Sequence, residues 1–110
     1  MKGNNSMASF DIQISRPAEK DLMDIKNYIS KELAQPETAQ KFLAKLSQKI
    51  NNLEKMPFRN PVVKDERLSR LGIRKLLVDN FLVFYFVNEE QKTVFIVRVL
   101  YNKRRWESLI

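Results

Sequence analysis

Three apolar runs of strand length, separated by short polar segments, dominate the second half of the chain. They lie within residues 72–106, and the segments between them, residues 79–80 and 88–91, are composed of residues that favour turns. The middle run, residues 81–87, has no polar side-chain group except the Tyr85 hydroxyl, so we expect it to lie inside a sheet with both faces covered. Because both connections are short, the three runs are expected to form an antiparallel meander.

The first half of the chain predicts one strand followed by two helices. Residues 10–15 alternate apolar and polar, as in a half-buried strand. Pro17 suits the first turn of a helix, and Pro36 ends that helix and can open the next one. Apolar residues then recur at spacings of three and four in two stripes: Ala18, Leu22, Ile25, Ile29 and Leu33, followed by Ala39, Phe42, Leu43, Leu46, Ile50 and Leu53. These stripes predict an amphipathic helical hairpin packed on the sheet, after which residues 56–61 begin an extended connection.

The predicted fold class is therefore α+β: an N-terminal strand, a two-helix hairpin, and a three-stranded antiparallel meander that completes one sheet. Helices gathered on one face would leave the opposite face partly uncovered. A chain of 110 residues has room for one domain, which we assign to residues 9–110. We expect residues 1–8 to be a flexible tail or a cloning remnant.

The composition limits the chemistry that this chain can perform. It contains no cysteine and no histidine, which excludes disulfides, thiol nucleophiles, imidazole catalysis and most structural zinc sites. Any chemistry must therefore use Lys, Arg, Tyr or carboxylates, and no metal and no cofactor is expected. No apolar run approaches the ~20 residues of a membrane-spanning helix, and the polar start lacks the apolar core of a signal peptide, so a cytoplasmic protein is expected.

The positive charge is concentrated in the second half. The net charge is +7, and residues 67–105 hold nine basic and three acidic residues, which is +6 of that total. Such a charge favours an anionic partner, either nucleic acid or an acidic protein. We expect a common rim beside the central strand to present the candidate partner-binding or nucleic-acid-binding residues, which are Arg74, Lys75, Arg98, Lys103, Arg104, Arg105 and Trp106.

Plainer interpretations of these residues stay open. Arg98 could snorkel over the sheet edge or pair with Glu107. The basic residues 103–105 could be the ordinary solvated end of a strand, since clustered charges are usually only hydrated. Trp106 could pack a terminal flap onto the core rather than contact a partner.

Two stretches carry a resemblance to a known family. The first reads Ile14-Ser15-x-x-Ala18-x-x-Asp21-Leu22-x-x-Ile25-x-x-Tyr28-Ile29. The second reads Arg74-Lys75-Leu76-Leu77-Val78-x-Asn80-Phe81-Leu82-Val83-Phe84-Tyr85, followed by Val97-Arg98-Val99-Leu100-Tyr101-x-x-Arg104-x-Trp106. In this order and at these spacings, the chain from about Phe10 to Trp106 resembles the RelE/ParE superfamily of bacterial toxins from type II toxin-antitoxin modules, and the first stretch resembles its ParE branch.

The resemblance implies one of two activities. RelE-like members cleave messenger RNA in the ribosomal A site with Lys, Arg and often a late tyrosine, whereas ParE-like members are described as poisoning DNA gyrase. Lys75 and Arg104 fit the ribonuclease pattern. However, Leu82 stands where that pattern has a central arginine, Ile73 stands at its second basic position, and Leu109 or Ile110 stands where the late tyrosine is expected.

Metal-free phosphodiester cleavage needs cations on the phosphate together with a general acid and base, and each lost element costs ~10²-fold or more. Tyr101 could replace the late tyrosine, but strand alternation predicts that it lies opposite Arg98, on the face of Phe95, Val97 and Val99. We therefore predict a ParE-like toxin that inhibits growth by binding DNA gyrase, contributes to plasmid stabilisation and is neutralised by an acidic antitoxin.

Two alternatives to the gyrase prediction remain. One is a RelE-like ribosome-dependent ribonuclease, whose catalytic residues would be Lys75, Arg98, Tyr101 and Arg104, with the ribosome and messenger RNA as partners. The other is a basic binding module without toxicity.

Overall fold

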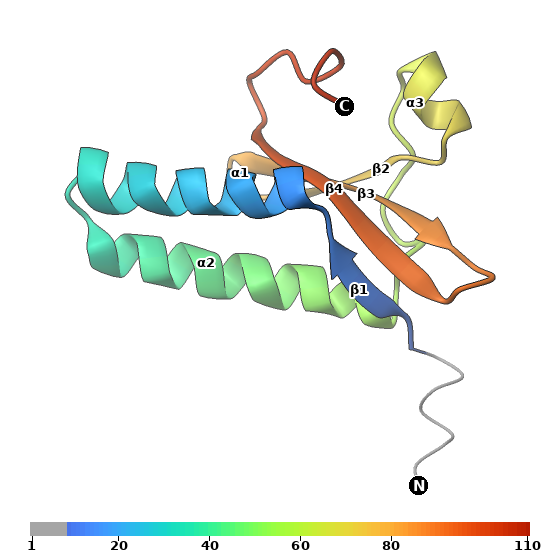
Figure 1. The fold of residues 1–110 in the computed structure, drawn as a ribbon, viewed down its shortest axis with the longest axis horizontal. Helices are drawn as coiled ribbons and strands as arrows, with labels where there is room; N and C mark the ends of the chain where they lie inside the picture. The colour runs from blue at the N-terminus through green and yellow to red at the C-terminus, as the bar shows by residue number, and fades with distance from the viewer. Residues whose placement is uncertain (1–8) are drawn as a thin grey trace, which may run out of the picture.

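A single four-stranded sheet organises the computed structural model, which describes residues 9–110 (Figure 1). The strand order is β1-β4-β3-β2, with β1 parallel to β4 and the other neighbours antiparallel. The strands are β1 Asp11–Ile14, β2 Arg74–Val78, β3 Phe81–Asn88 and β4 Thr93–Tyr101. This topology, together with the two helices that follow β1, confirms the predicted α+β fold. The expectation for residues 1–8 lies outside the described part of the chain.

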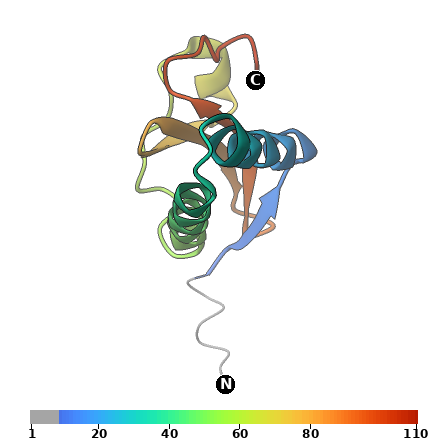
Figure 2. The ribbon, with the colours of Figure 1, turned by 90° about the vertical axis from the view of Figure 1, so that its left-hand side faces the viewer.

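Two antiparallel helices pack on one face of the sheet, as the apolar stripes predicted (Figures 1 and 2). Helix α1 is Arg16–Asn27 and continues as a π-helical turn, Tyr28–Glu32. Helix α2 is Pro36–Asn51 and ends in a 3₁₀ turn, Asn52–Glu54. Both helices have proline at the first or second helical position, where the missing backbone N–H has no intrahelical partner to lose. No helix in residues 9–110 has the length and apolar character that crossing a membrane requires.

Ser15 joins the start of α1 to the sheet. Its Oγ accepts a hydrogen bond from the backbone N–H of Ala18 at 3.1 Å, the usual contact of a helix N-cap. The same Oγ donates to the backbone carbonyl of Val97 in β4 at 2.8 Å. At the other end of the helix, Leu33 was predicted to be the last residue of the apolar stripe. It lies after the π-helical turn and is 47% exposed, so the buried stripe ends before it.

Apolar side chains form a cluster on each side of the sheet. The helix-side cluster contains Ala18, Ile25, Phe42, Leu46, Ile50, Leu53, Val78, Val83, Tyr85, Val94, Ile96 and Val99. The second cluster contains Val63, Leu68, Ile73, Leu82, Phe84 and Leu100, with Phe86, Val97, Trp106, Leu109 and Ile110 packed against it. The second face of the sheet is thus covered by the connection between α2 and β2 and by the C-terminal residues, for which the sequence predicted no helix or strand.

A short helix that the sequence did not predict supplies part of this cover. Helix α3, Glu66–Arg70, begins at Asp65, whose carboxylate accepts the backbone N–H of Leu68 at 3.0 Å. Leu68 is completely buried, and it is the residue by which α3 packs on the sheet. Gly72 follows with a φ of +79°, a left-handed conformation that costs glycine little. Figure 2 shows α3 and the C-terminal residues together on the side of the sheet away from α2.

A β-bulge in β4 changes which side chains share a face. The pairs on either side of it are Phe84 with Arg98 and Tyr85 with Ile96. Val97 is therefore an additional residue, and the alternation shifts by one position after it. Val97 packs on the second cluster, whereas Val99 belongs to the helix-side cluster and Tyr101 contacts Phe81 beside it. The prediction that Tyr101 shares a face with Val97 is wrong, because no alternation pattern reveals a bulge.

Candidate docking surface

A row of three residues crosses the sheet on its second face. Lys75 in β2 pairs with Phe84 in β3, and Phe84 pairs with Arg98 in β4. Cross-strand partners point to the same face, so the two cations flank the phenyl ring. The indole of Trp106 packs on that ring, with the centroids 4.7 Å apart. Trp106 thus packs on the second cluster, which agrees with the interpretation that it holds a terminal flap against the core.

Arg98 is fully engaged within the molecule. Its Nε and Nη2 donate to the two carboxylate oxygens of Asp21 in α1 at 2.7 and 2.8 Å, and its Nη1 donates to the backbone carbonyl of Leu109 at 2.9 Å. The hydrogen-bonded ion pair raises the pKa of the Arg98 guanidinium above its usual value. Asp21 also accepts the backbone N–H of Val99 at 2.9 Å. Arg98 therefore fixes α1, β4 and the C-terminal residues to one another, and its partner is Asp21 rather than Glu107.

The C-terminal residues are held from a second direction. Arg67 in α3 donates from Nη2 to the backbone carbonyl of Glu107 at 3.0 Å. Leu109 and Ile110 pack against the second cluster. Because Trp106, Leu109 and Ile110 all contribute apolar contacts, the tail is part of the folded domain.

Arg74 faces the other side of the sheet. It pairs with Tyr85, whose ring belongs to the helix-side cluster. Its Nη1 donates to the backbone carbonyl of Asn60 at 2.6 Å, and its guanidinium lies 5.2 Å from the centre of the Phe58 ring. The adjacent Tyr85 hydroxyl donates to the backbone carbonyl of Pro57 at 2.8 Å, and burial raises the pKa of this phenol. Arg74 thus holds the loop after α2 against β2.

A shallow pocket of about 540 Å³ opens beside Trp106 on the second face. Lys75, Leu77 and Leu82 line it from the sheet, and Asn102 and Trp106 line it from the chain after β4. The Oδ1 atom of Asn102 is buried without a hydrogen-bond partner among the described residues. An acceptor that is buried without a partner lowers the stability of the fold. The pocket therefore combines a cation with an apolar wall.

The predicted residues fall into two groups. The first group is Lys75 and Trp106, which line the pocket, together with Lys103, Arg104 and Arg105; with Asn102, we call these residues the basic rim. Residues 103–105 are exposed and link the two lining residues Asn102 and Trp106. Arg74 and Arg98 lie outside the rim, since their guanidinium groups hold the loop after α2 and the Asp21 carboxylate. Sequence reasoning missed Asn102, although a polar residue just after a strand is a weak signal of a functional loop.

Of the four residues named for ribonuclease chemistry, Tyr101 and Arg98 are not available beside Lys75. Lys75 faces the second cluster, whereas Tyr101 contacts Phe81 on the helix side, and Arg98 is bound to Asp21. Arg104 is exposed, and its backbone N–H donates to the carbonyl of Tyr101 at 3.0 Å. Within residues 9–110, no group of three acidic side chains is placed to hold a metal ion.

Comparison with known proteins identifies the family and the fold. Residues 12–106 match the model of the ParE toxin of type II toxin-antitoxin system, parDE. A solved structure of the chromosomal ParDE toxin-antitoxin system from P. aeruginosa is similar, with a TM-score of 0.71 and 19% identity over 86% of this chain and 97% of that one. No curated protein sequence matches the chain.

Two further solved structures, both of toxin-antitoxin complexes, share the fold. The RelBE2 complex from Mycobacterium tuberculosis has a TM-score of 0.62 at 19% identity, over 86% of this chain and 93% of that one. The archaeal RelE-RelB complex from Pyrococcus horikoshii has a TM-score of 0.52 at 16% identity, over 87% of this chain and 98% of that one. At these identities the likeness is one of fold.

Proposed function

The chain belongs to the ParE toxin family of type II toxin-antitoxin systems, and from that premise we propose that it inhibits growth by binding DNA gyrase. The observation that carries this proposal is that Tyr101 lies on the opposite face of the sheet from Lys75, while Arg98, on the same face as Lys75, is bound to Asp21. A metal-free ribonuclease needs its cations and its acid-base groups within reach of one phosphate. An inhibitor that acts by binding needs only an accessible surface, which the basic rim offers.

We propose that the basic rim is the part of the toxin that contacts its target. Lys103, Arg104 and Arg105 are exposed and form no ion pair among the described residues, so their charges are available to an acidic surface. Electrostatic complementarity of this kind speeds association and selects the partner. The action on gyrase would place the protein in the cytoplasm and would account for growth inhibition and plasmid stabilisation.

A cognate acidic antitoxin is the second partner that we propose. The similar solved structures from P. aeruginosa, M. tuberculosis and P. horikoshii are of toxin-antitoxin systems or complexes. On this chain the pocket of the basic rim has room for an apolar side chain against Leu77, which is 58% exposed. The net charge of +7 favours an acidic partner.

Induction of the chain without an antitoxin tests the gyrase proposal. Plasmid supercoiling and messenger RNA integrity are followed in parallel, and we expect a change in supercoiling before transcripts are lost. The variant Lys103→Ala/Arg104→Ala/Arg105→Ala should restore growth. A matched control, Arg16→Ala/Lys26→Ala/Lys31→Ala, removes the same charge from exposed positions on the helical hairpin and should stay toxic.

A RelE-like ribonuclease is the alternative activity. It is favoured by Lys75 and Arg104, which fit the ribonuclease pattern and belong to the same basic rim. This alternative predicts rapid, ribosome-dependent transcript cleavage with unchanged supercoiling on induction. It also predicts that Lys75→Ala alone abolishes toxicity.

A further inference from the structure

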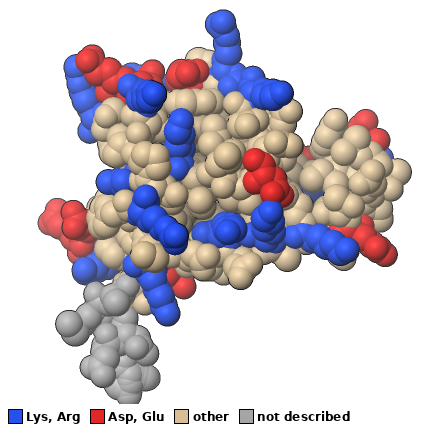
Figure 3. Space-filling view, turned by 180° about the vertical axis from the view of Figure 1, so that it is seen from behind, with Lys and Arg blue, Asp and Glu red and all other residues tan. Residues whose placement is uncertain are grey.

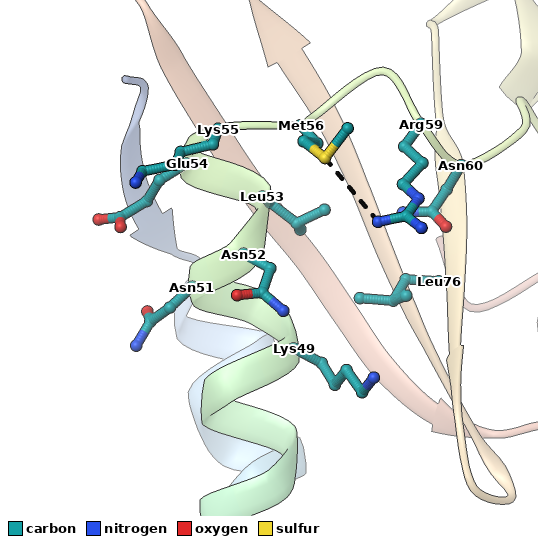
Figure 4. Close-up of a pocket in the computed structure, with 10 residues that line it drawn as sticks. All are labelled: Lys49, Asn51, Asn52, Leu53, Glu54, Lys55, Met56, Arg59, Asn60 and Leu76. Carbon is teal, nitrogen blue, oxygen red and sulfur yellow. Dashed lines mark hydrogen bonds between the residues drawn. The ribbon is translucent and has the colours of Figure 1, made fainter. Parts of the chain in front are cut away.

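A second cleft lies on the helix side, between the end of α2, the loop after it and β2 (Figure 4). Its volume is about 540 Å³. Lys49 reaches into it from α2 and Arg59 reaches into it from the loop, with Leu53 and Leu76 beside them. The cleft is distinct from the basic rim, since Leu76 and Asn60 are the only residues that line both pockets.

The charged side chains that reach into this cleft, Lys49 and Arg59, are hydrogen-bond donors. Neither Lys49 nor Arg59 forms an ion pair within residues 9–110, and both are exposed. The Arg59 guanidinium contacts only the Met56 sulfur, at 3.8 Å, which is a weak acceptor. The one carboxylate among the lining residues, that of Glu54, points away from the space in Figure 4. Two cations directed into one cleft without a carboxylate favour an anion there.

A row of lysines on α2 leads to the cleft. Lys41, Lys45 and Lys49 are spaced by four residues, so they lie on one exposed face of the helix about 6 Å apart along its axis. Figure 3 shows basic side chains in a row along this helix. Lys45 is paired with Asp79 at 2.6 Å, whereas Lys41 forms no ion pair among the described residues. The row spans about 12 Å, which is long enough to face more than one phosphate of a DNA strand, since the phosphates of one strand repeat every ~3.4 Å along the duplex axis.

We propose that the lysine face of α2 binds the phosphate backbone of nucleic acid, with one phosphate seated between Lys49 and Arg59. Lys, Arg and Asn side chains are the usual donors to phosphate oxygens, and Asn52 at the cleft adds an amide. An acidic helix or strand would also need apolar anchors, but the positions between the lysines on this face, such as Ala44 and Gln48, are small or polar. The contact is independent of base sequence, and it does not depend on gyrase being the target.

Fluorescence anisotropy with a labelled mixed-sequence DNA duplex tests the proposal, using the full chain over a range of salt concentrations. Lys49→Gln/Arg59→Gln removes the two cleft cations, and Arg16→Gln/Lys26→Gln removes the same charge from α1. Each lost phosphate contact lowers the slope of log K against log salt by ~0.9, so the cleft variant, which loses the one phosphate seated between Lys49 and Arg59, should lose about 0.9 from that slope. Across a fourfold rise in salt the wild type should then lose roughly three- to fourfold more affinity than the cleft variant.

The control variant should keep the wild-type slope, and both variants should keep the wild-type midpoint of chemical denaturation. Absence of duplex binding by the wild type overturns the proposal, as does an equal change of slope in the cleft and control variants.

A polyglutamate peptide is the second ligand to be tested. If this peptide binds at the cleft more tightly than the duplex does, the site binds an acidic protein and the proposal is wrong. Because gyrase is absent from this assay, its failure leaves the gyrase proposal untouched.

Discussion

Breaking the ion pair between Asp21 and Arg98 should both destabilise the protein and release its C-terminal residues. The two side chains are 10% and 21% exposed, and they share two hydrogen bonds. The Asp21→Asn substitution keeps a carbonyl oxygen for the Val99 N–H but leaves the Arg98 charge without a counterion. The Arg98→Met substitution leaves the carboxylate in the same position. Neither single variant preserves the charge balance of the site.

The expected cost follows from this burial. Removing one partner of a buried ion pair costs ~3–5 kcal/mol, and because Arg98 is partly exposed we expect about 3 kcal/mol for each single variant. For a domain of this size that loss lowers the melting temperature by about 10–20 °C. The double variant Asp21→Asn/Arg98→Met removes both charges. It should be more stable than the sum of the single variants predicts, by about 1.5 kcal/mol or more.

Urea denaturation of the four proteins in this cycle measures the coupling. Trp106 is the only tryptophan in the chain, so its emission reports on the tail separately. Arg98→Met should shift the emission to the red in the folded protein, because the contact with the Leu109 carbonyl is lost. Asp24→Asn is the matched control on the same helix, where the exposed pair with Lys20 is worth less than about 0.5 kcal/mol. A cost for Asp21→Asn no larger than for this control would refute the reasoning.

Three further predictions concern the cover of the sheet and the loop beside it. Trp106→Ala should cost about 2 kcal/mol, because a partly buried ring is removed from Phe84; a change below about 0.5 kcal/mol in the urea midpoint would mean that the tail does not pack there. Burial raises the pKa of Tyr85 in the folded protein. The stability should therefore be constant below about pH 10 and should fall as the pH rises through the higher folded pKa. Denaturation of the wild type and of Tyr85→Phe over a series of pH values would measure this fall. Gly72→Ala should cost about 1 kcal/mol because of the positive φ, and thermal unfolding would contradict this if the melting temperature stayed unchanged.

The fold could be predicted because its main elements are long and regular. The helical stripes and the apolar run of β3 each extend over several turns or strand positions, and two short turns dictate the meander. Helix α3 was not predicted because it has only five residues and one buried apolar side chain, Leu68, so its sequence has no helical repeat of apolar residues. The bulge at Val97 escaped because an inserted residue leaves the apolar character of β4 unchanged.

The candidate site was less predictable than the fold because it depends on pairings between distant residues. Adjacent residues of a strand point to opposite faces, which separates Arg74 from Lys75 although the sequence groups them. Arg98 pairs with Asp21, which lies 77 positions earlier in the chain. Only the packing of α1 on β4 brings these two residues together. The exposed cations at positions 103–105 were predictable because they follow the last strand directly.

The most direct test of the central claim is a plasmid supercoiling assay with purified DNA gyrase and purified toxin. We predict that the wild-type chain inhibits supercoiling in a dose-dependent manner, and that the Lys103→Ala/Arg104→Ala/Arg105→Ala variant does not. Undiminished gyrase activity at a large excess of folded toxin, together with cleavage of messenger RNA on purified ribosomes by the same preparation, would contradict the account.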